Sequence, residues 1–204
     1  MKKTLSPRTI ALIGMLTAIA AVLMILDFPI VFIAPTFYKF DFSEIPVLIG
    51  AFSMGPLAGV IIELIKVLLN FLLNGTVTGG VGELANFIMG CAFILPAGII
   101  YKFKHNKKGA FIGLVAGTIV LTAVGSLINA FVLLPVYSQV FGMDISAFVA
   151  MGSEIFSSVD SLATFVLFCV APFNLFKGVI CSIITALLYK KVSYVIKAFR
   201  DKRI

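Results

Sequence analysis

The sequence predicts an all-α membrane protein with six transmembrane helices, and three observations carry this prediction. First, 61% of the 204 residues are apolar and the mean hydropathy is +1.15, whereas soluble domains are nearer half apolar. Second, long apolar runs recur, and about 20 apolar residues suffice for one helical crossing. Third, most basic residues lie in short clusters beside these runs. The chain has room for five or six crossings, so we expect one membrane domain over residues 1–204.

Turn residues divide the apolar sequence into six candidate spans. The spans cover residues 9–26, 43–53, 56–73, 82–101, 109–134 and 167–189. The predicted breaks are Phe28-Pro29, Met54-Gly55-Pro56, the glycine-containing segment 74–82, and Leu134-Pro135. The first span could belong to a cleaved signal peptide, but its apolar run continues past the candidate cleavage site at residues 18–20. We therefore expect it to be retained as a helix.

The basic residues predict the orientation of the chain. Thirteen of the sixteen fall in three clusters: Lys2, Lys3 and Arg8; Lys102, Lys104, Lys107 and Lys108; and Lys190, Lys191, Lys197, Arg200, Lys202 and Arg203. Clusters beside apolar runs indicate cytoplasmic segments rather than a nucleic-acid surface, so both termini are expected in the cytoplasm of a plasma-membrane protein. This parity requires residues 43–53 to cross, although they rise only about 16 Å as a helix. The short span must be tilted, partly extended or sheltered by neighbours.

Seven acidic residues fall in or beside segments predicted to be external. They are Asp27, Asp41, Glu44, Glu83, Asp144, Glu154 and Asp160. Glu63 and Lys66 instead lie three residues apart within the third span. We interpret them as a local ion pair, with a proton relay as the alternative.

No residue pattern indicates catalysis, a metal site or a cofactor. The single histidine, His105, lies in a basic loop, and the sequence contains neither a P-loop nor a Gly-x-Ser-x-Gly motif. Cys91, Cys169 and Cys181 lie inside apolar segments without metal-ligand spacing, and we interpret them as small buried residues. The protein is therefore not expected to be an enzyme.

Polar residues within the spans predict a ligand site. Asn174 and Lys177 lie one helical turn apart in the outer part of the last span, and Asn70, Asn86 and Asn129 lie at similar depth on three others. Buried amides and a buried ammonium are costly unless they are paired, and a polar ligand would pair them. The alternatives are hydrogen bonds between helices and a lysine side chain that reaches the interface.

The loop "PTFYKFDFSE", residues 35–44, contains four aromatic side chains interleaved with Lys39 and Asp41. Such a loop could lie in the membrane interface as an aromatic belt, or it could cover a pocket and stack on a flat ligand. The first span carries small residues four apart, Gly14 with Ala18 and Thr17 with Ala21, which permit close approach of another helix.

Four segments in this order, "KFDFSEIPVLIGAFSMGPLAG", "LANFIMG", "INAFVLLPVY" and "APFNLFKG", resemble the riboflavin-binding S components of energy-coupling factor (ECF) transporters. The similarity covers about residues 9–197. It implies a six-helix protein that captures the vitamin from outside and associates with a transmembrane T component and two ATPases.

The resemblance also implies roles for particular residues. Asn129, Asn174 and Lys177 would hydrogen-bond the isoalloxazine ring, the loop around Lys39, Phe40 and Asp41 would cover it, and the region of Glu83 and Asn86 would line the pocket. Gly14 and Ala18 match the small-residue motif that faces the T component, with glycine in place of the first alanine.

Three alternatives remain open at this stage. Lys39 is unexpected in the covering loop and could favour a phosphorylated flavin, FMN, over riboflavin. The transported substrate could also be another vitamin. Finally, Glu63 and Lys66 could belong to a stand-alone proton-coupled carrier.

Overall fold

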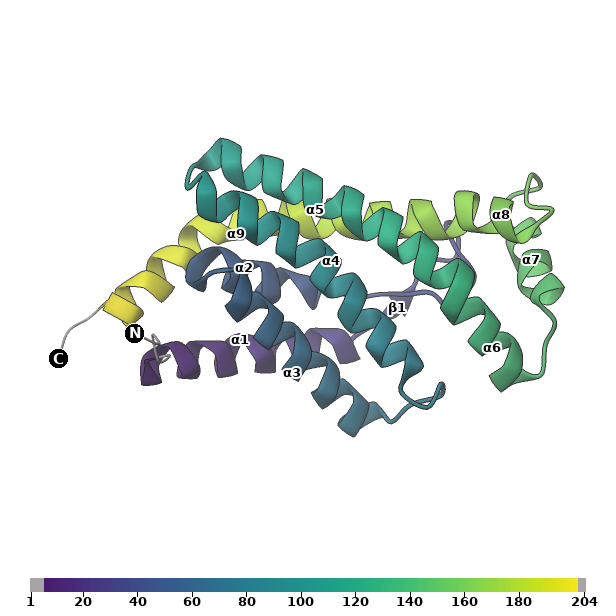
Figure 1. Ribbon diagram of the computed structural model, residues 1–204, viewed down its shortest axis with the longest axis horizontal. Helices are drawn as coiled ribbons and strands as arrows, with labels where there is room; N and C mark the ends of the chain where they lie inside the picture. Colours follow the sequence, from purple (N-terminus) through teal and green to yellow (C-terminus); the bar gives the residue numbers. More distant parts are fainter. Residues whose placement is uncertain (1–5, 202–204) are drawn as a thin grey trace.

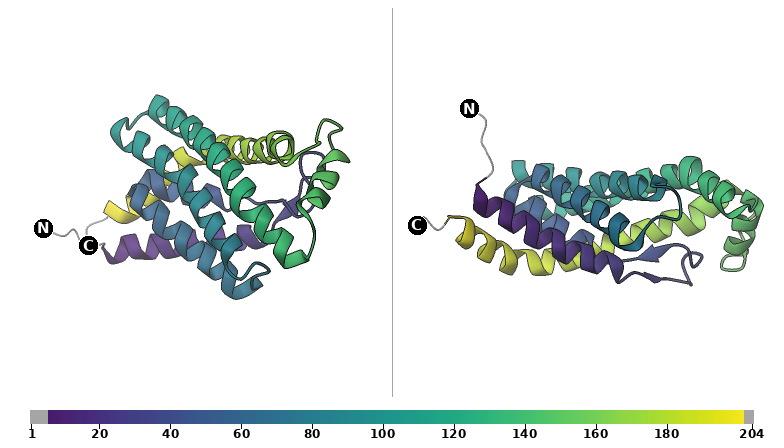
Figure 2. Two further views of the ribbon diagram at one scale, coloured as in Figure 1. Left: turned by 45° about the vertical axis from the view of Figure 1, so that its right-hand side comes forward. Right: turned by 90° about the horizontal axis from the view of Figure 1, so that it is seen from below.

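The computed structural model describes residues 6–201, which form an elongated helical bundle (Figures 1 and 2). The α-helices are α1 Pro7–Ile25, α2 Glu44–Met54, α3 Pro56–Asn74, α4 Val81–Phe103, α5 Lys107–Ile128, α6 Leu134–Phe141, α7 Ile145–Ser153, α8 Leu162–Phe165 and α9 Ala171–Asp201. Two π-helical turns, η1 Asn129–Leu133 and η2 Val166–Val170, and two short strands, β1 Phe28–Pro29 and β2 Lys39–Phe40, complete the described chain.

Five helical stretches among the described residues are long and apolar enough to cross a membrane. They are α1, α3, α4, the continuous stretch Lys107–Phe141 and the stretch Leu162–Tyr189. The expected all-α membrane architecture is therefore confirmed. The remaining predicted span, residues 43–53, corresponds to the eleven-residue helix α2, which is too short to cross alone.

Helix α2 lies in the centre of the bundle and contacts α1, α3, α4 and α9. Its residues from Glu44 to Ser53 are all buried. Neighbouring helices therefore supply the shelter that the sequence required of this span. The packing is close: a Cβ on Gly50 would lie 2.4 Å from Ile62 Cδ1 of α3. The turn to α3 forms as predicted, with Gly55 at a φ of 103° and Pro56 opening the helix.

The predicted break at Leu134-Pro135 is wrong, because the helix continues to Phe141. Immediately before the proline, residues 129–133 widen into a π turn, so that the Leu134 N–H bonds the carbonyl of Asn129. Pro135 then takes the second position of α6, where a missing N–H is tolerated. A π turn also precedes Pro172: η2 ends at Val170, α9 begins at Ala171, and Pro172 takes the second position of α9. The chain between Phe141 and α8 also contains the unpredicted helix α7.

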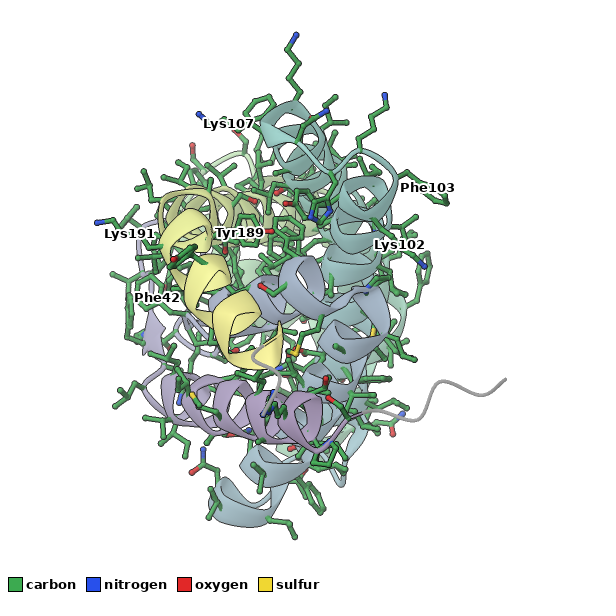
Figure 3. All side chains as sticks on the ribbon, turned by 90° about the vertical axis from the view of Figure 1, so that its left-hand side faces the viewer. Phe42, Lys102, Phe103, Lys107, Tyr189 and Lys191 are labelled. Carbon is green, nitrogen blue, oxygen red and sulfur yellow. The ribbon has the colours of Figure 1, made fainter. Side chains whose placement is uncertain are left out.

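Three basic regions gather at one end of the bundle. The start of α1, the connection between α4 and α5, and the last turns of α9 lie together at the left of Figure 1. Viewed onto this end, Lys102, Lys107 and Lys191 project outward from three elements (Figure 3). The arrangement agrees with the predicted cytoplasmic face. Lys2, Lys3, Lys202 and Arg203 lie outside the described residues.

Candidate functional site

A cavity of about 250 Å³ lies in the half of the bundle away from this basic end. Its wall includes the four asparagines predicted to share one level: Asn70 of α3, Asn86 of α4, Asn129 of η1 and Asn174 of α9. Four segments distant in sequence thus bring amides to a single space. Ligand sites are typically concave spaces in which a few polar groups converge on apolar walls.

Two of these amides are held by their own helices. Asn129 Nδ2 donates to the Gly125 carbonyl at 2.8 Å, and Asn174 Nδ2 donates to the Val170 carbonyl at 3.0 Å. Tyr38 donates its hydroxyl proton to Asn129 Oδ1 at 2.8 Å. Since Asn129 and Asn174 are 2% and 3% exposed, they form the deep wall of the cavity with fixed orientations.

Lys177 also lines the cavity, where it is paired with Asp41. Lys177 Nζ lies 2.8 Å from Asp41 Oδ2, and the other oxygen of Asp41 accepts the N–H of Ser43 at 2.8 Å. Burial raises the pKa of the Asp41 carboxyl, but the nearby ammonium groups of Lys177 and Lys66 outweigh this effect, so that its pKa lies below the ordinary value. An ammonium has three donors, so Lys177 retains capacity for a ligand beside its ion pair.

The short strands explain which residues of the covering loop face the cavity. β1 and β2 pair antiparallel, with Phe28 opposite Phe40 and Pro29 opposite Lys39. Side chains alternate between faces along a strand. Lys39 and Asp41 accordingly line the cavity, whereas Phe40 packs at 5.5 Å from the ring of Phe28 on the other face.

Phe40 is therefore not brought to the cavity with its neighbours. It is 1% exposed and also packs against Phe42 and Phe176. The period-two alternation of residues 39–42 is typical of a strand and places Phe40 on the face opposite to Lys39 and Asp41.

Only one face of helix α4 lines the cavity. Gly82, Asn86 and Met89 line the cavity, at spacings of four and three residues along one helical face. Glu83 lies off this face and accepts a hydrogen bond from Thr76 Oγ1 at 3.0 Å. The structure thus brings together Asn86, Asn129, Asn174, Lys177, Lys39 and Asp41 of the predicted site, but neither Glu83 nor Phe40.

Aromatic residues complete the wall: two come from the loop 35–44, and the other two, Tyr137 and Phe173, are not singled out by the sequence pattern. Phe37, Tyr38, Tyr137 and Phe173 line the cavity. Phe37 lies 6.0 Å from Tyr137 and Tyr38 lies 5.6 Å from Phe173, between ring centres. These faces suit a flat ring ligand. Tyr137 lies beyond the predicted end of the fifth span, so only the continuation of the helix through Pro135 could have placed it here.

The third span contains a buried charge cluster below the cavity. Lys66 Nζ lies 2.7 Å from Glu63 Oε2 and 2.9 Å from Glu44 Oε1, and donates to Ser43 Oγ at 3.1 Å. The predicted Glu63–Lys66 pair is confirmed. Glu44, which directly follows the loop 35–43, is only 2% exposed, and its carboxylate neutralises Lys66.

One face of α1 is exposed among the residues that the structure describes. Gly14 and Ala18 are exposed there, and a Cβ on Gly14 would meet nothing within 4 Å. Thr17 and Ala21, the other small pair, lie on the adjoining side of the helix and are buried. Gly14 and Ala18 thus lie on a surface that a further helix could approach closely.

A helical membrane bundle with a polar and aromatic cavity is typical of multi-pass membrane proteins that bind small solutes. The described residues contain no cluster of three or more histidine, cysteine or carboxylate side chains able to hold a metal. Comparison with known proteins identifies the class more closely. Residues 8–189 match the family model of the ECF transporter, substrate-specific component, and the chain belongs to this family. The protein is accordingly a transport subunit and not an enzyme.

Relatives extend over nearly the whole chain. It is 39% identical over 186 residues to the riboflavin transporter RibU of Staphylococcus aureus, covering 91% of this chain and 90% of the relative. It is 33% identical over 198 residues to the riboflavin transporter FmnP of Bacillus subtilis, covering 97% and 98%. The solved structure of the S component of a bacterial ECF transporter superposes with a TM-score of 0.71 at 38% identity, covering 93% of this chain and 97% of that one.

Proposed function

We propose that this protein is the riboflavin-binding subunit of an ATP-driven vitamin importer in the plasma membrane. The observation that carries the proposal is the convergence of Asn129, Asn174 and Lys177 on one cavity with aromatic walls. A flavin ring presents carbonyl and ring-nitrogen acceptors together with one N–H, which complement amides and an ammonium. The relatives named riboflavin transporters support this choice of ligand.

In this proposal the flavin ring lies between the aromatic side chains, with its polar edge toward Asn129, Asn174 and Lys177. Phe37 and Tyr38 of the covering loop and Phe173 of α9 supply aromatic contacts to the ring. Because the amides are already oriented by hydrogen bonds to their own helices, little side-chain entropy is lost on binding.

Energy for transport comes from partners in this proposal. The sequence has no P-loop, so ATP would be hydrolysed by two ATPase subunits joined through a T component. Gly14 and Ala18 of α1 provide a surface on which a T-component helix could pack. The Glu63–Lys66 alternative of a proton-coupled carrier gains no support, because Lys66 is enclosed by three partners and is 0% exposed.

The first experiment is the absorbance spectrum of detergent-purified protein, followed by riboflavin titration of flavin-free protein. We expect near-stoichiometric bound flavin or saturable quenching of riboflavin fluorescence. Asn174→Ala combined with Lys177→Ala should abolish binding in a folded protein, whereas Lys102→Ala with Lys104→Ala, at the opposite end, should leave it unchanged. Absence of both bound flavin and quenching would remove riboflavin as the ligand, and other vitamins would then be screened.

A further inference from the structure

The cavity contains charges of both signs in equal number. Its charged lining residues among those described are Asp27, Lys39, Asp41 and Lys177, which sum to a formal charge of zero. Each lysine is paired with one aspartate, Lys39 with Asp27 at 3.1 Å and Lys177 with Asp41 at 2.8 Å. Neither ammonium is therefore an uncompensated positive charge.

The two ion pairs lie in different surroundings. The side chains of Lys177 and Asp41 are 12% and 7% exposed, whereas those of Lys39 and Asp27 are 54% and 32% exposed. The first pair thus belongs to the deep wall with Asn129 and Asn174, and the second lies at the mouth. A ligand whose ring occupies the deep wall has its tail directed toward Asp27 and Lys39.

The paired strands hold the mouth charges in register. Pro29 lies opposite Lys39, and extending the register by one residue places Asp27 opposite Asp41. Two carboxylates facing each other across a ribbon repel. Lys39, which lies diagonal to Asp27 on the ribbon, neutralises Asp27. Lys177 of α9 neutralises Asp41. Asp27 therefore keeps Lys39 neutralised at the mouth.

We propose that Asp27, through its ion pair with Lys39, makes the mouth of the cavity select a flavin with a neutral tail over one that ends in a phosphate. This inference rests on the proposed function and assigns to Asp27 a role in substrate specificity. A phosphate monoester carries about −1.5 to −2 charges at neutral pH. Lys39 alone would attract it, but Asp27 cancels that attraction. A phosphate at the mouth would lose part of its hydration without gaining an uncompensated cation, and this cost makes the pocket favour riboflavin over FMN.

The test is the ratio of the FMN and riboflavin dissociation constants, measured by flavin-fluorescence quenching on flavin-free protein at low salt. Wild-type protein should bind riboflavin more tightly than FMN. Asp27→Asn should shift the ratio about fivefold toward FMN, as Coulomb's law gives for a phosphate about 8 Å from the lost carboxylate in a water-like dielectric. Lys39→Gln should shift it in the opposite direction, and the double variant should return it close to wild type.

Asp144→Asn is the matched control, because it removes the same charge from an exposed residue that does not line the cavity; its ratio should equal that of wild type. Added salt should weaken the FMN preference of Asp27→Asn by screening. Any of three results would overturn the inference. Wild type could bind FMN more tightly than riboflavin, Asp27→Asn could leave the ratio of dissociation constants unchanged, or both single variants could shift this ratio in the same direction. Loss of riboflavin and FMN binding in wild type would instead refute the proposed function.

Discussion

Replacing Asp41 by asparagine tests the buried ion pair at the cavity wall. Asparagine keeps the shape of the side chain but removes the charge that lies 2.8 Å from Lys177 Nζ. The side chains of this pair are only 7% and 12% exposed, so water can replace little of the lost interaction. Breaking one partner of a buried pair typically costs about 3–5 kcal/mol, and we expect that loss of stability for the flavin-free protein.

The chain offers a matched control. Asp27→Asn removes the same charge from an ion pair of similar length, 3.1 Å, whose side chains are 54% and 32% exposed. Exposed pairs contribute about 0–1 kcal/mol. For a chain of this size, each kcal/mol of lost stability lowers the midpoint temperature of thermal unfolding by roughly 2–4 °C. This midpoint should therefore fall by about 6–20 °C for Asp41→Asn and by at most about 4 °C for Asp27→Asn.

Thermal unfolding can be followed in detergent with a thiol-reactive fluorophore. Cys169 and Cys181 are buried in the folded chain and become reactive on unfolding. Lys177→Met should also destabilise the protein. Asp41→Asn combined with Lys177→Met should lower the stability by less than the sum of the two single changes, because the double variant leaves no unpaired charge in the pair. Equal midpoints for Asp41→Asn and Asp27→Asn, or strict additivity in the double variant, would refute the reasoning.

The same pair predicts a pH dependence. The pKa of Asp41 lies below its ordinary value, so the stabilisation is complete above the ordinary aspartate pKa of about 4 and is lost as pH falls through the lower folded value. The difference in midpoint between wild type and Asp41→Asn should therefore stay constant from neutral pH to about pH 5 and shrink only in stronger acid. A difference that already declines between pH 7 and 5 would contradict this assignment.

Two further substitutions test the ligand site and the partner surface. Gly125→Ala would place a Cβ 2.9 Å from the Asn174 side chain; the displaced amide should weaken riboflavin binding about tenfold or more in the quenching titration, and unchanged affinity would detach Asn174 from the site. Gly14→Leu fills the exposed small face of α1 and should reduce co-purification with the T component at unchanged riboflavin affinity, whereas full retention of the T component would exclude this face as the contact.

Much of the helical framework follows from short-range sequence signals. Met54-Gly55-Pro56 combines a residue that accepts positive φ with one that starts a helix, and the structure turns there. Asn174 and Lys177 could be placed on the cavity because few explanations exist for an amide and an ammonium one turn apart in an apolar helix. In such cases the local chemistry permits few alternatives.

The unpredicted features include one local backbone irregularity and two contacts between distant residues. Pro135 signals a break locally, but the π turn at residues 129–133 lets the helix pass through it. The burial of Glu44 could not be predicted from its neighbours, because its partner Lys66, 2.9 Å away, lies on α3. Phe40 packs away from the cavity because residues 28–29 and 39–40 pair across a nine-residue loop.

The enclosure of α2 bears on how the chain enters the bilayer during synthesis. This helix is too short to span lipid, and it begins with a carboxylate whose counter-charge, Lys66, is made 22 residues later. Alone in the insertion machinery, it would present an unpaired charge to hydrocarbon. We expect α2 and α3 to be integrated together as one hairpin once Lys66 has emerged. Glycosylation-site mapping of nascent chains truncated before and after α3 would show whether residues 44–54 enter the membrane only in the longer chains.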